Sequence, residues 1–324
     1  MKKVFLAVVA MVGMLTSCST QTDVVQSEVH GDYTQYVNPL MGTQSSFELS
    51  TGNTYPAIAM PWGMNFWTPR TNKIGDGWQY TYTANKIYGF EQTHQPSPWI
   101  NDYGQFSLMP VTGEVEMDEK KRASWFSHKG EIALPHYYKV YLAEYDVVTE
   151  MVPTERASMF RFTFPDADSY VVVDAYDRGS SIKVIPEENK IIGYTTRNSG
   201  GVPENFKNYF VVVFDKPFTY KATFSNDVTP AKPDASVPVT LKEGKLEQTD
   251  YHTGAVIGFK TKKGEKVHAR VASSFISPEQ AELNLKELGN DNFDTVVEKG
   301  KNRWNEVLGK AEVAGRSEER RVGK

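Results

Sequence analysis

The chain has 324 residues, a formal net charge of −4 and 12% aromatic residues. This charge balance lacks the basic footprint of a nucleic-acid-binding protein, so we predict no nucleic-acid partner. The chain has a single cysteine, Cys18, which excludes an internal disulfide.

The first residues have the order of a bacterial lipoprotein signal. Two lysines precede an apolar run over 4–15, and Leu-Thr-Ser-Cys18 follows. The run is shorter than the ~20 apolar residues that a transmembrane helix needs. We therefore predict a signal peptide at 1–17, lipid attachment at Cys18 and a flexible tether over 18–32. The expected location is the bacterial outer membrane, on its periplasmic or its outer side, with the lipid as membrane anchor; an unmodified thiol is the alternative.

The long middle part of the chain is rich in β-type segments separated by Gly, Pro, Asn and Asp. In 158–164 the residues alternate with period two, which places Phe160, Phe162 and Phe164 on one face of a strand. Further strands are expected at 170–174, 190–196, 209–214, 254–260 and 267–275. Because no helical pattern intervenes, we predict a mainly β protein with a large antiparallel β-sandwich over 33–276.

The pattern becomes helical at Ser277. Ser277-Pro-Glu-Gln280 has the hydroxyl N-cap, the proline and the glutamine of a capping box. A first helix carries Ala281, Leu285 and Leu288 on one face, and a second carries Phe293, Val297, Trp304 and Leu308. We interpret 277–315 as a helical linker and the start of a truncated helical domain.

The last residues, 316–324, are polar and basic apart from Val322. The string resembles the conceptual translation of a sequencing adapter, and we interpret it as an artefactual tail. A disordered basic tail is the alternative.

The stretch from Asn53 to Gly104 combines aromatic residues with Gly, Pro and polar residues, and we expect irregular loops that carry binding groups. A sugar site needs a flat apolar plate for the C–H face of a pyranose and acceptors for its hydroxyls. Trp99, with Asn101 and Asp102 beside it, supplies these groups, and Trp78 is a second candidate plate.

Each candidate also has an ordinary structural explanation. Trp78 and Trp99 would serve equally as core residues under loops. His94 could bind substrate or be a hydrogen-bonded interior histidine, and Asp102 could be a turn or capping residue.

Several motifs in chain order carry a family resemblance. They are Tyr36-Val-Asn-Pro-Leu-Met-Gly-Thr43, Gly52-Asn-Thr-Tyr-Pro56, Pro61-Trp-Gly-Met64, Tyr88-Gly-Phe-Glu-Gln-Thr-His94, Asp102-Tyr-Gly104, Ser274-Phe-Ile-Ser-Pro-Glu-Gln-Ala281 and Trp304-Asn-Glu-Val-Leu308. Over about 33–315 the chain resembles the amino-terminal part of the α-mannosidases of glycoside hydrolase family 92.

The resemblance implies a galactose-mutarotase-like β-sandwich followed by linker helices and a carboxy-terminal (α/α)6 barrel. It implies an exo-acting, inverting, calcium-dependent α-mannosidase whose substrates are mannose-containing glycans. The loop with Pro-Ser-Pro-Trp99 is most similar to members that cut α-1,2 bonds.

The resemblance also implies how the site is divided. A sandwich loop contacts the substrate, and we carry this role to Trp99 first and then to His94, Asp102 and Trp78. The catalytic carboxyl groups and the calcium ligands are expected in the barrel, so we assign no catalytic or metal-binding residue to this chain. A non-catalytic glycan-binding surface lipoprotein is the alternative function.

Overall fold

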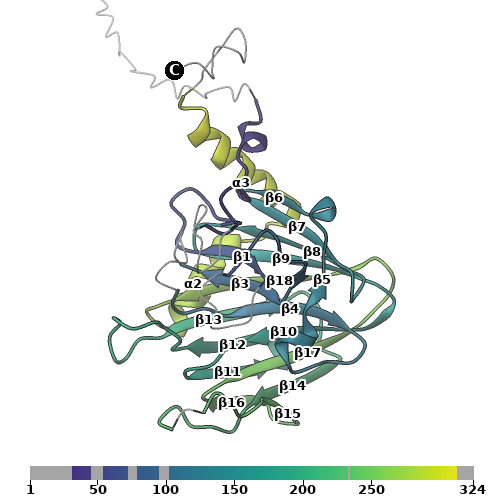
Figure 1. Ribbon diagram of the computed structural model, residues 1–324, viewed down its shortest axis with the longest axis vertical. Helices are drawn as coiled ribbons and strands as arrows, with labels where there is room; N and C mark the ends of the chain where they lie inside the picture. Colours follow the sequence, from purple (N-terminus) through teal and green to yellow (C-terminus); the bar gives the residue numbers. More distant parts are fainter. Residues whose placement is uncertain (1–30, 45–53, 72–78, 95–101, 233, 312–324) are drawn as a thin grey trace, which may run out of the picture.

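The computed structural model describes residues 31–44, 54–71, 79–94, 102–232 and 234–311, which form two large antiparallel sheets packed against each other (Figure 1). The seven-stranded sheet has the order β1 (Phe66–Arg70), β3 (Gly89–Thr93), β4 (Ser107–Thr112), β10 (Ala167–Asp174), β17 (Thr253–Thr261), β14 (Tyr220–Ser225) and β15 (Thr240–Glu243). The nine-stranded sheet has the order β16 (Glu247–Asp250), β11 (Ser180–Ile185), β12 (Lys190–Thr195), β13 (Asn208–Phe214), β18 (Glu265–Ser274), β9 (Ala157–Phe164), β8 (Val147–Pro153), β7 (Tyr137–Leu142) and β6 (Ile132–Leu134).

Short elements complete the described part of the chain. A two-stranded pair joins β2 (Lys86–Ile87) to β5 (Ser124–Trp125). The helical elements are η1 (Tyr33–Tyr36), α1 (Glu119–Arg122), η3 (His128–Gly130), η4 (Pro186–Glu188), α2 (Pro278–Leu285), η5 (Lys286–Leu288) and α3 (Phe293–Leu308). None of the helices in the described ranges is long and apolar enough to cross a membrane.

Alternation along β9 shows how the residues build the core. Phe160, Phe162 and Phe164 are buried between the two sheets, as their spacing predicted. Ala157 and Met159, at the alternate positions earlier in β9, face the other way and join a second apolar cluster with α2, η5 and α3. The nine-stranded sheet is therefore covered on both faces, by the other sheet and by helices, which explains its adjacent apolar residues.

The predicted mainly β sandwich is confirmed, and so are the strands expected from 158 to 275. The expectation of irregular loops between 53 and 104 was wrong in part. Two segments of that stretch, β1 and β3, pair with each other over five residues each. Aromatic and polar residues are mixed there because these strands carry buried polar side chains as well as apolar ones.

The helices begin as the sequence predicts. The Ser277 hydroxyl accepts a hydrogen bond from the Gln280 amide, and Pro278 occupies the first helical position. The Gln280 side chain, however, donates to Asn284. Only half of the capping box is therefore formed.

The buried face of α3 differs from the predicted one. The buried residues are Phe293, Val296, Gly300 and Asn305, and Trp304 is only partly buried. A Cβ added at Gly300 would lie 3.2 Å from the Cβ of His136, so the helix approaches the β6–β7 turn closely at its glycine. Val297 and Leu308 are only partly buried, and Val297 packs against the second apolar cluster.

The amino-terminal segment holds α3. The side-chain oxygen of Asn305 accepts hydrogen bonds from the backbone amides of Tyr33 and Thr34, at 2.8 and 3.3 Å. Lys301 pairs with Asp32 at 3.2 Å. Figure 1 shows η1 beside α3, where the helix extends beyond the sheets. Two segments about 270 positions apart in the sequence thus form one unit.

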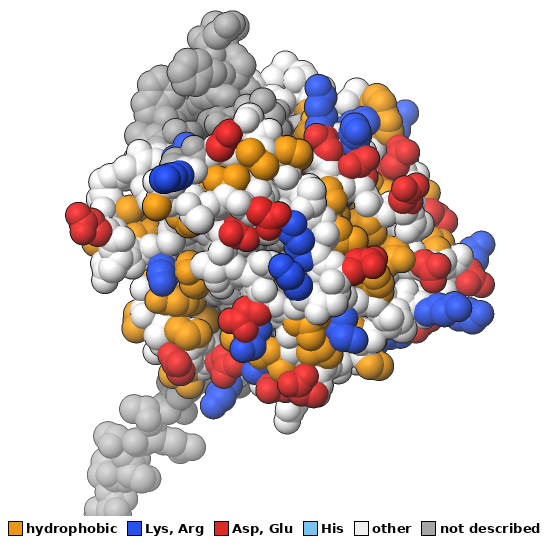
Figure 2. Space-filling model, turned by 90° about the horizontal axis from the view of Figure 1, so that it is seen from below, with side chains coloured by type: hydrophobic (Ala, Val, Ile, Leu, Met, Phe, Trp, Pro, Cys, Tyr) orange, Lys and Arg blue, Asp and Glu red, His pale blue; other side chains and the backbone are white. Residues whose placement is uncertain are grey.

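The end of the sandwich shown in Figure 2 carries acidic and basic side chains side by side. Apolar side chains lie among them, and neither sign of charge dominates that view. This face therefore offers no extended basic surface to a polyanion.

Candidate substrate-contacting site

Two of the predicted site residues, His94 and Asp102, lie in the described part of the chain. His94 follows β3, and Asp102 lies shortly before β4. The other predicted positions, Trp99, Trp78 and Cys18, lie outside the described residues. The geometry of the site is therefore built from the two ends of the 94–104 loop.

Asp102 joins these two ends. One carboxylate oxygen accepts a hydrogen bond from the His94 amide at 2.9 Å, and the other accepts from the Tyr103 amide at 2.8 Å. The carboxylate is buried, and bonds from main-chain N–H groups to an ionised oxygen are stronger than neutral ones. Asp102 is therefore a clasp that brings the two ends of the loop together.

The ring of His94 is fixed by the same segment. Its Nδ1 lies 2.8 Å from the carbonyl oxygen of Tyr103. A carbonyl only accepts, so Nδ1 carries the proton, and in the neutral ring Nε2 offers a lone pair. The rings of Tyr103 and Phe275 flank the imidazole at 5.4 and 4.9 Å between centroids.

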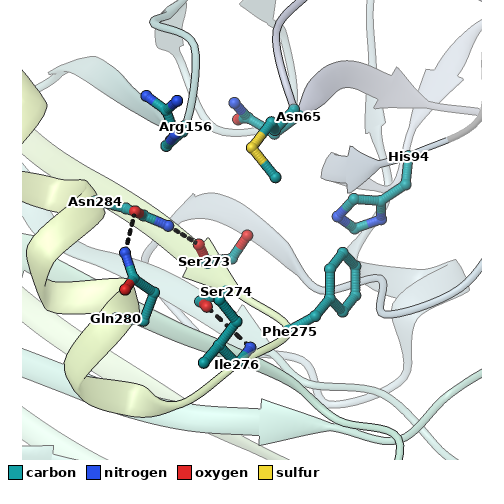
Figure 3. A pocket seen from close by; sticks show the side chains of 10 residues that line it. Asn65, His94, Arg156, Ser273, Ser274, Phe275, Ile276, Gln280 and Asn284 are labelled. Carbon is teal, nitrogen blue, oxygen red and sulfur yellow. Dashed lines mark hydrogen bonds between the residues drawn. The ribbon is translucent and has the colours of Figure 1, made fainter. Parts of the chain in front are cut away.

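His94 lines a pocket of about 170 Å³ (Figure 3). The walls come from the turn before β1, the turn between β8 and β9, and the junction of β18 with α2, and their residues are Met64, Asn65, Arg156, Ser273, Ser274, Phe275, Ile276, Gln280 and Asn284. Segments that are far apart in the sequence thus meet around the imidazole.

Most amides of this pocket are already engaged. Asn284 donates to the Ser273 carbonyl at 2.8 Å, and Gln280 donates to Asn284 at 2.9 Å. Asn65 accepts from the Trp67 indole at 2.7 Å. Nε2 of His94 has no hydrogen bond to any described residue and could bind a ligand, and the half-exposed guanidinium of Arg156 lies 3.6 Å from the Glu155 carboxylate. This pocket can hold a hydroxyl-bearing molecule by hydrogen bonds.

The described lining contains no Asp or Glu. Inverting glycoside hydrolysis uses two carboxyl groups ~6.5–9.5 Å apart, one as acid and one as base. The described residues also contain no group of three or more His, Cys, Asp or Glu that could hold a metal ion. This part of the pocket can therefore bind and orient a ligand, and it does not by itself contain the groups for hydrolysis.

A buried polar network, which the sequence analysis did not identify, lies beside the loop. The Glu91 carboxylate on β3 accepts hydrogen bonds from the Gln105 side-chain amide at 2.9 Å and from the Tyr176 hydroxyl at 3.3 Å. Nε of Arg70 lies 3.3 Å from a Glu91 carboxylate oxygen. Burial raises the pKa of Glu91 to about 7, against the opposing effect of Arg70. Glu91 lies within the Tyr88–His94 motif. An acidic residue inside a strand-like segment is the one feature of the sequence that could have indicated a buried polar site here.

Backbone strain accompanies this network. Tyr176, which is fully buried, has φ 65° and Arg178 has φ 71°, both in the left-handed region. Bulky residues seldom adopt this conformation, and such strain concentrates at functional sites. The Tyr176 ring lies under the Arg70 guanidinium at 5.1 Å, so the strained turn packs against the Glu91 network.

Residues 36–274 match the model of the glycosyl hydrolase family 92 N-terminal domain. No curated protein matches the chain.

Solved structures of the same family are similar to the chain. An inverting mannosidase of family GH92 from Bacteroides thetaiotaomicron VPI-5482 is 45% identical, with a TM-score of 0.81 over 88% of this chain and 37% of that one. A GH92 α-mannosidase from Bacteroides thetaiotaomicron is 31% identical, with a TM-score of 0.74 over 88% of this chain and 39% of that one. The latter enzyme has also been solved in complex with mannoimidazole.

The chain thus spans well under half the length of these solved relatives, while the family model covers most of the chain itself. The matched residues include β1 to β18, both ends of the 94–104 loop and the buried Glu91 network. The chain therefore belongs to glycosyl hydrolase family 92 and contains the N-terminal domain of that family.

Proposed function

We propose that this chain is the amino-terminal part of an exo-acting α-mannosidase that removes mannose from α-linked glycans with inversion of configuration. The observation that carries the proposal is the 45% identity and the TM-score of 0.81 to an inverting mannosidase over 88% of the chain. The mannoimidazole complex of a second relative supports a mannoside as substrate. The Pro-Ser-Pro-Trp99 loop favours an α-1,2 bond.

In this proposal the 94–104 loop forms one wall of the mannose pocket. Asp102 holds the loop closed at its base, and His94 turns Nε2 toward the space where a sugar hydroxyl would bind. Trp99 supplies the flat plate for the C–H face of the sugar, and Trp78 is a second candidate. Asp102 acts by positioning, because both of its oxygens bond to the protein main chain.

The acid, the base and the calcium ligands belong, in this proposal, to the region that follows in the longer relatives. The described residues do not fit a calcium site, because they contain no cluster of three acidic or histidine side chains. The contribution of this chain is to bind and orient the substrate and to exclude water from one side of it.

The proposed cellular location rests on the leader of the sequence. Residues 1–17 would be removed, and a lipid on Cys18 would attach the protein to the bacterial outer membrane. Mass spectrometry of the purified wild-type protein and of Cys18→Ala tests this point. A lipid-sized mass increase that the variant lacks would support the anchor, and masses that differ only by the sulfur of the substituted cysteine would refute it.

A chimaera tests the enzymatic role. Residues 36–274 replace the matching domain of the 45% identical mannosidase, and proton NMR follows the first anomer released from an aryl α-mannoside. We expect β-mannose as the first product, and we expect Trp99→Ala to lower kcat/KM by about tenfold or more. Residues 18–315 alone should not turn over the substrate.

The control for the chimaera is Trp125→Ala, because Trp125 is exposed on the β2–β5 pair and the family motifs do not include it. A folded chimaera with wild-type kcat/KM after Trp99→Ala would contradict the role of the loop. Turnover by residues 18–315 alone would contradict the proposed division of the site. Glycan binding without turnover by the folded chimaera would favour the non-catalytic alternative.

A further inference from the structure

An exposed aromatic ring, that of Tyr82, lies outside the His94 pocket and could serve as a plate for a sugar. The ring of Tyr82 stacks on the imidazole of His128, with 4.0 Å between centroids and 5° between planes. Tyr82 is still 39% exposed. Because one face of the phenol ring lies against His128, its other face and its edge provide the accessible surface.

The plate is fixed in place from behind. Nε2 of His128 donates to the Tyr82 carbonyl at 2.7 Å, and Nδ1 contacts the Glu131 carboxylate. The side chain of Glu131 is buried and also accepts a hydrogen bond from the Tyr138 hydroxyl. An aromatic ring that is held by such a series of contacts loses little conformational entropy when a ligand binds.

Tyr82 also borders a depression of about 560 Å³. It is lined by Asn38, Leu40, Gly42, Gln44 and Tyr82. The Tyr82 amide donates to the Thr43 carbonyl at 3.1 Å, which ties the two lining segments together. The volume falls within the ~300–1,000 Å³ that is typical of small-molecule sites.

The polar groups of this depression are neutral. The side-chain oxygen of Asn38 accepts from the Leu40 amide at 3.0 Å, and its Nδ2 has no hydrogen bond to any described residue. No charged side chain is among the lining residues, which argues against an anionic ligand. An aromatic face beside a free amide donor matches a pyranose, which has C–H groups on one face and hydroxyls at its edge.

We propose that this surface, Asn38, Leu40, Gly42, Gln44 and Tyr82, binds one pyranose unit of a glycan at a place separate from the His94 pocket. The two depressions share no lining residue. Binding at this surface does not require hydrolysis, and the surface would hold a glycan to the sandwich whether or not the 94–104 loop is occupied.

Saturation-transfer NMR on the purified chain tests the proposal, with methyl α-D-mannopyranoside and methyl α-D-glucopyranoside as probes. We expect Tyr82→Ala to weaken binding of at least one probe by about tenfold or more, and Tyr82→Phe to retain it because the plate remains. Asn38→Ala should weaken binding to a smaller extent. The matched control is Tyr141→Ala, which removes a comparably exposed tyrosine from β7.

The variants also separate this proposal from the function proposed above. Thermal unfolding of Tyr82→Ala within a few degrees of wild type shows that lost binding is not lost folding. Binding that is lost with Tyr82→Ala but retained with Trp99→Ala supports the separate site. Binding that is lost only with Trp99→Ala, or no binding of either probe to the wild-type chain, overturns it.

Discussion

At the scale of single residues, the site depends on the carboxylate of Asp102. Its two oxygens satisfy the amides at both ends of the 94–104 loop, and the side chain is buried. An asparagine has one acceptor oxygen, so Asp102→Asn should leave one of the two amides unsatisfied, which costs about 1–3 kcal/mol. Urea unfolding should report this loss of stability.

Hydrogen exchange provides the local measurement for Asp102→Asn. We expect faster exchange at the His94 amide or at the Tyr103 amide, because each donates to one carboxylate oxygen and asparagine keeps only one acceptor oxygen. Asp168→Asn is the control, since Asp168 is exposed at the start of β10. Unchanged protection of both amides would show that the clasp is not needed.

Gly104 adds a steric requirement next to the clasp. It has φ 68°, and an added Cβ would lie 2.7 Å from the Cβ of Asn208. Gly113 has a similar φ of 77°, and nothing lies within 4 Å of an added Cβ. Gly104→Ala should therefore destabilise the fold by more than Gly113→Ala, which bears only the backbone strain of about 1 kcal/mol.

Chemical denaturation of Gly104→Ala and Gly113→Ala separates the effect of backbone strain from that of the close contact with Asn208. The difference between their free energies of unfolding measures the crowding at Asn208. Equal losses would mean that the loop base can shift away from β13 without cost.

At the scale of elements, the Glu91 network joins β1, β3 and the turn after β10. Burial raises the pKa of Glu91 most, and Asp102 raises it further; Arg70, the hydrogen bond from Gln105, and Arg197 lower it. Glu91 has a folded-state pKa of about 7, above the ordinary value of 4.5. The folded protein thus binds more protons than the unfolded chain between these two pH values.

The sign of the pH dependence follows from proton linkage. The stability contributed by Glu91 is fully present below pH 4.5 and is lost as the pH rises through about 7. Glu91→Gln cannot ionise, so its stability relative to wild type should increase as the pH rises from 5 to about 7.5. Thermal unfolding across this range checks the slope, and parallel curves for the two proteins would contradict the assignment.

Elements were predicted more completely than their contacts. Period-two alternation placed the three phenylalanines of β9 in the core, and the Ser277 cap placed the start of α2. The strands β1 and β3 were not recognised, because buried polar residues interrupt the apolar pattern of each: Thr68 and Arg70 in β1, and Glu91 and Gln92 in β3. The partners of Glu91, which are Arg70, Gln105 and Tyr176, come from other elements, and no local pattern in the sequence indicates such pairs.

At the scale of the whole molecule, Asn305 connects the amino-terminal segment to α3. It accepts from the Tyr33 and Thr34 amides. Asn305→Ala should leave both amides without this acceptor, at a cost of about 1–3 kcal/mol, and should release η1 from the helix. Limited proteolysis near residue 36 should become faster.

Asn302→Ala is the matched control, because Asn302 lies on the exposed side of the same helix. It should leave both stability and proteolysis unchanged. Equal proteolysis rates for Asn305→Ala and wild type would show that other contacts, such as Lys301 with Asp32, suffice to hold the segment.

The amino-acid order alone determined the class of fold, the six strands expected between 158 and 275, the capped helix at Ser277 and the family motifs. These properties depend on local periodicity, on capping and on short residue strings, all of which can be read along the chain. Only the tertiary structure decided that Asp102 closes the loop base, that Glu91 is buried among distant partners, and that α3 packs through Gly300. Those outcomes depend on which distant segments meet and how closely their backbones approach, and local sequence patterns do not encode such distances.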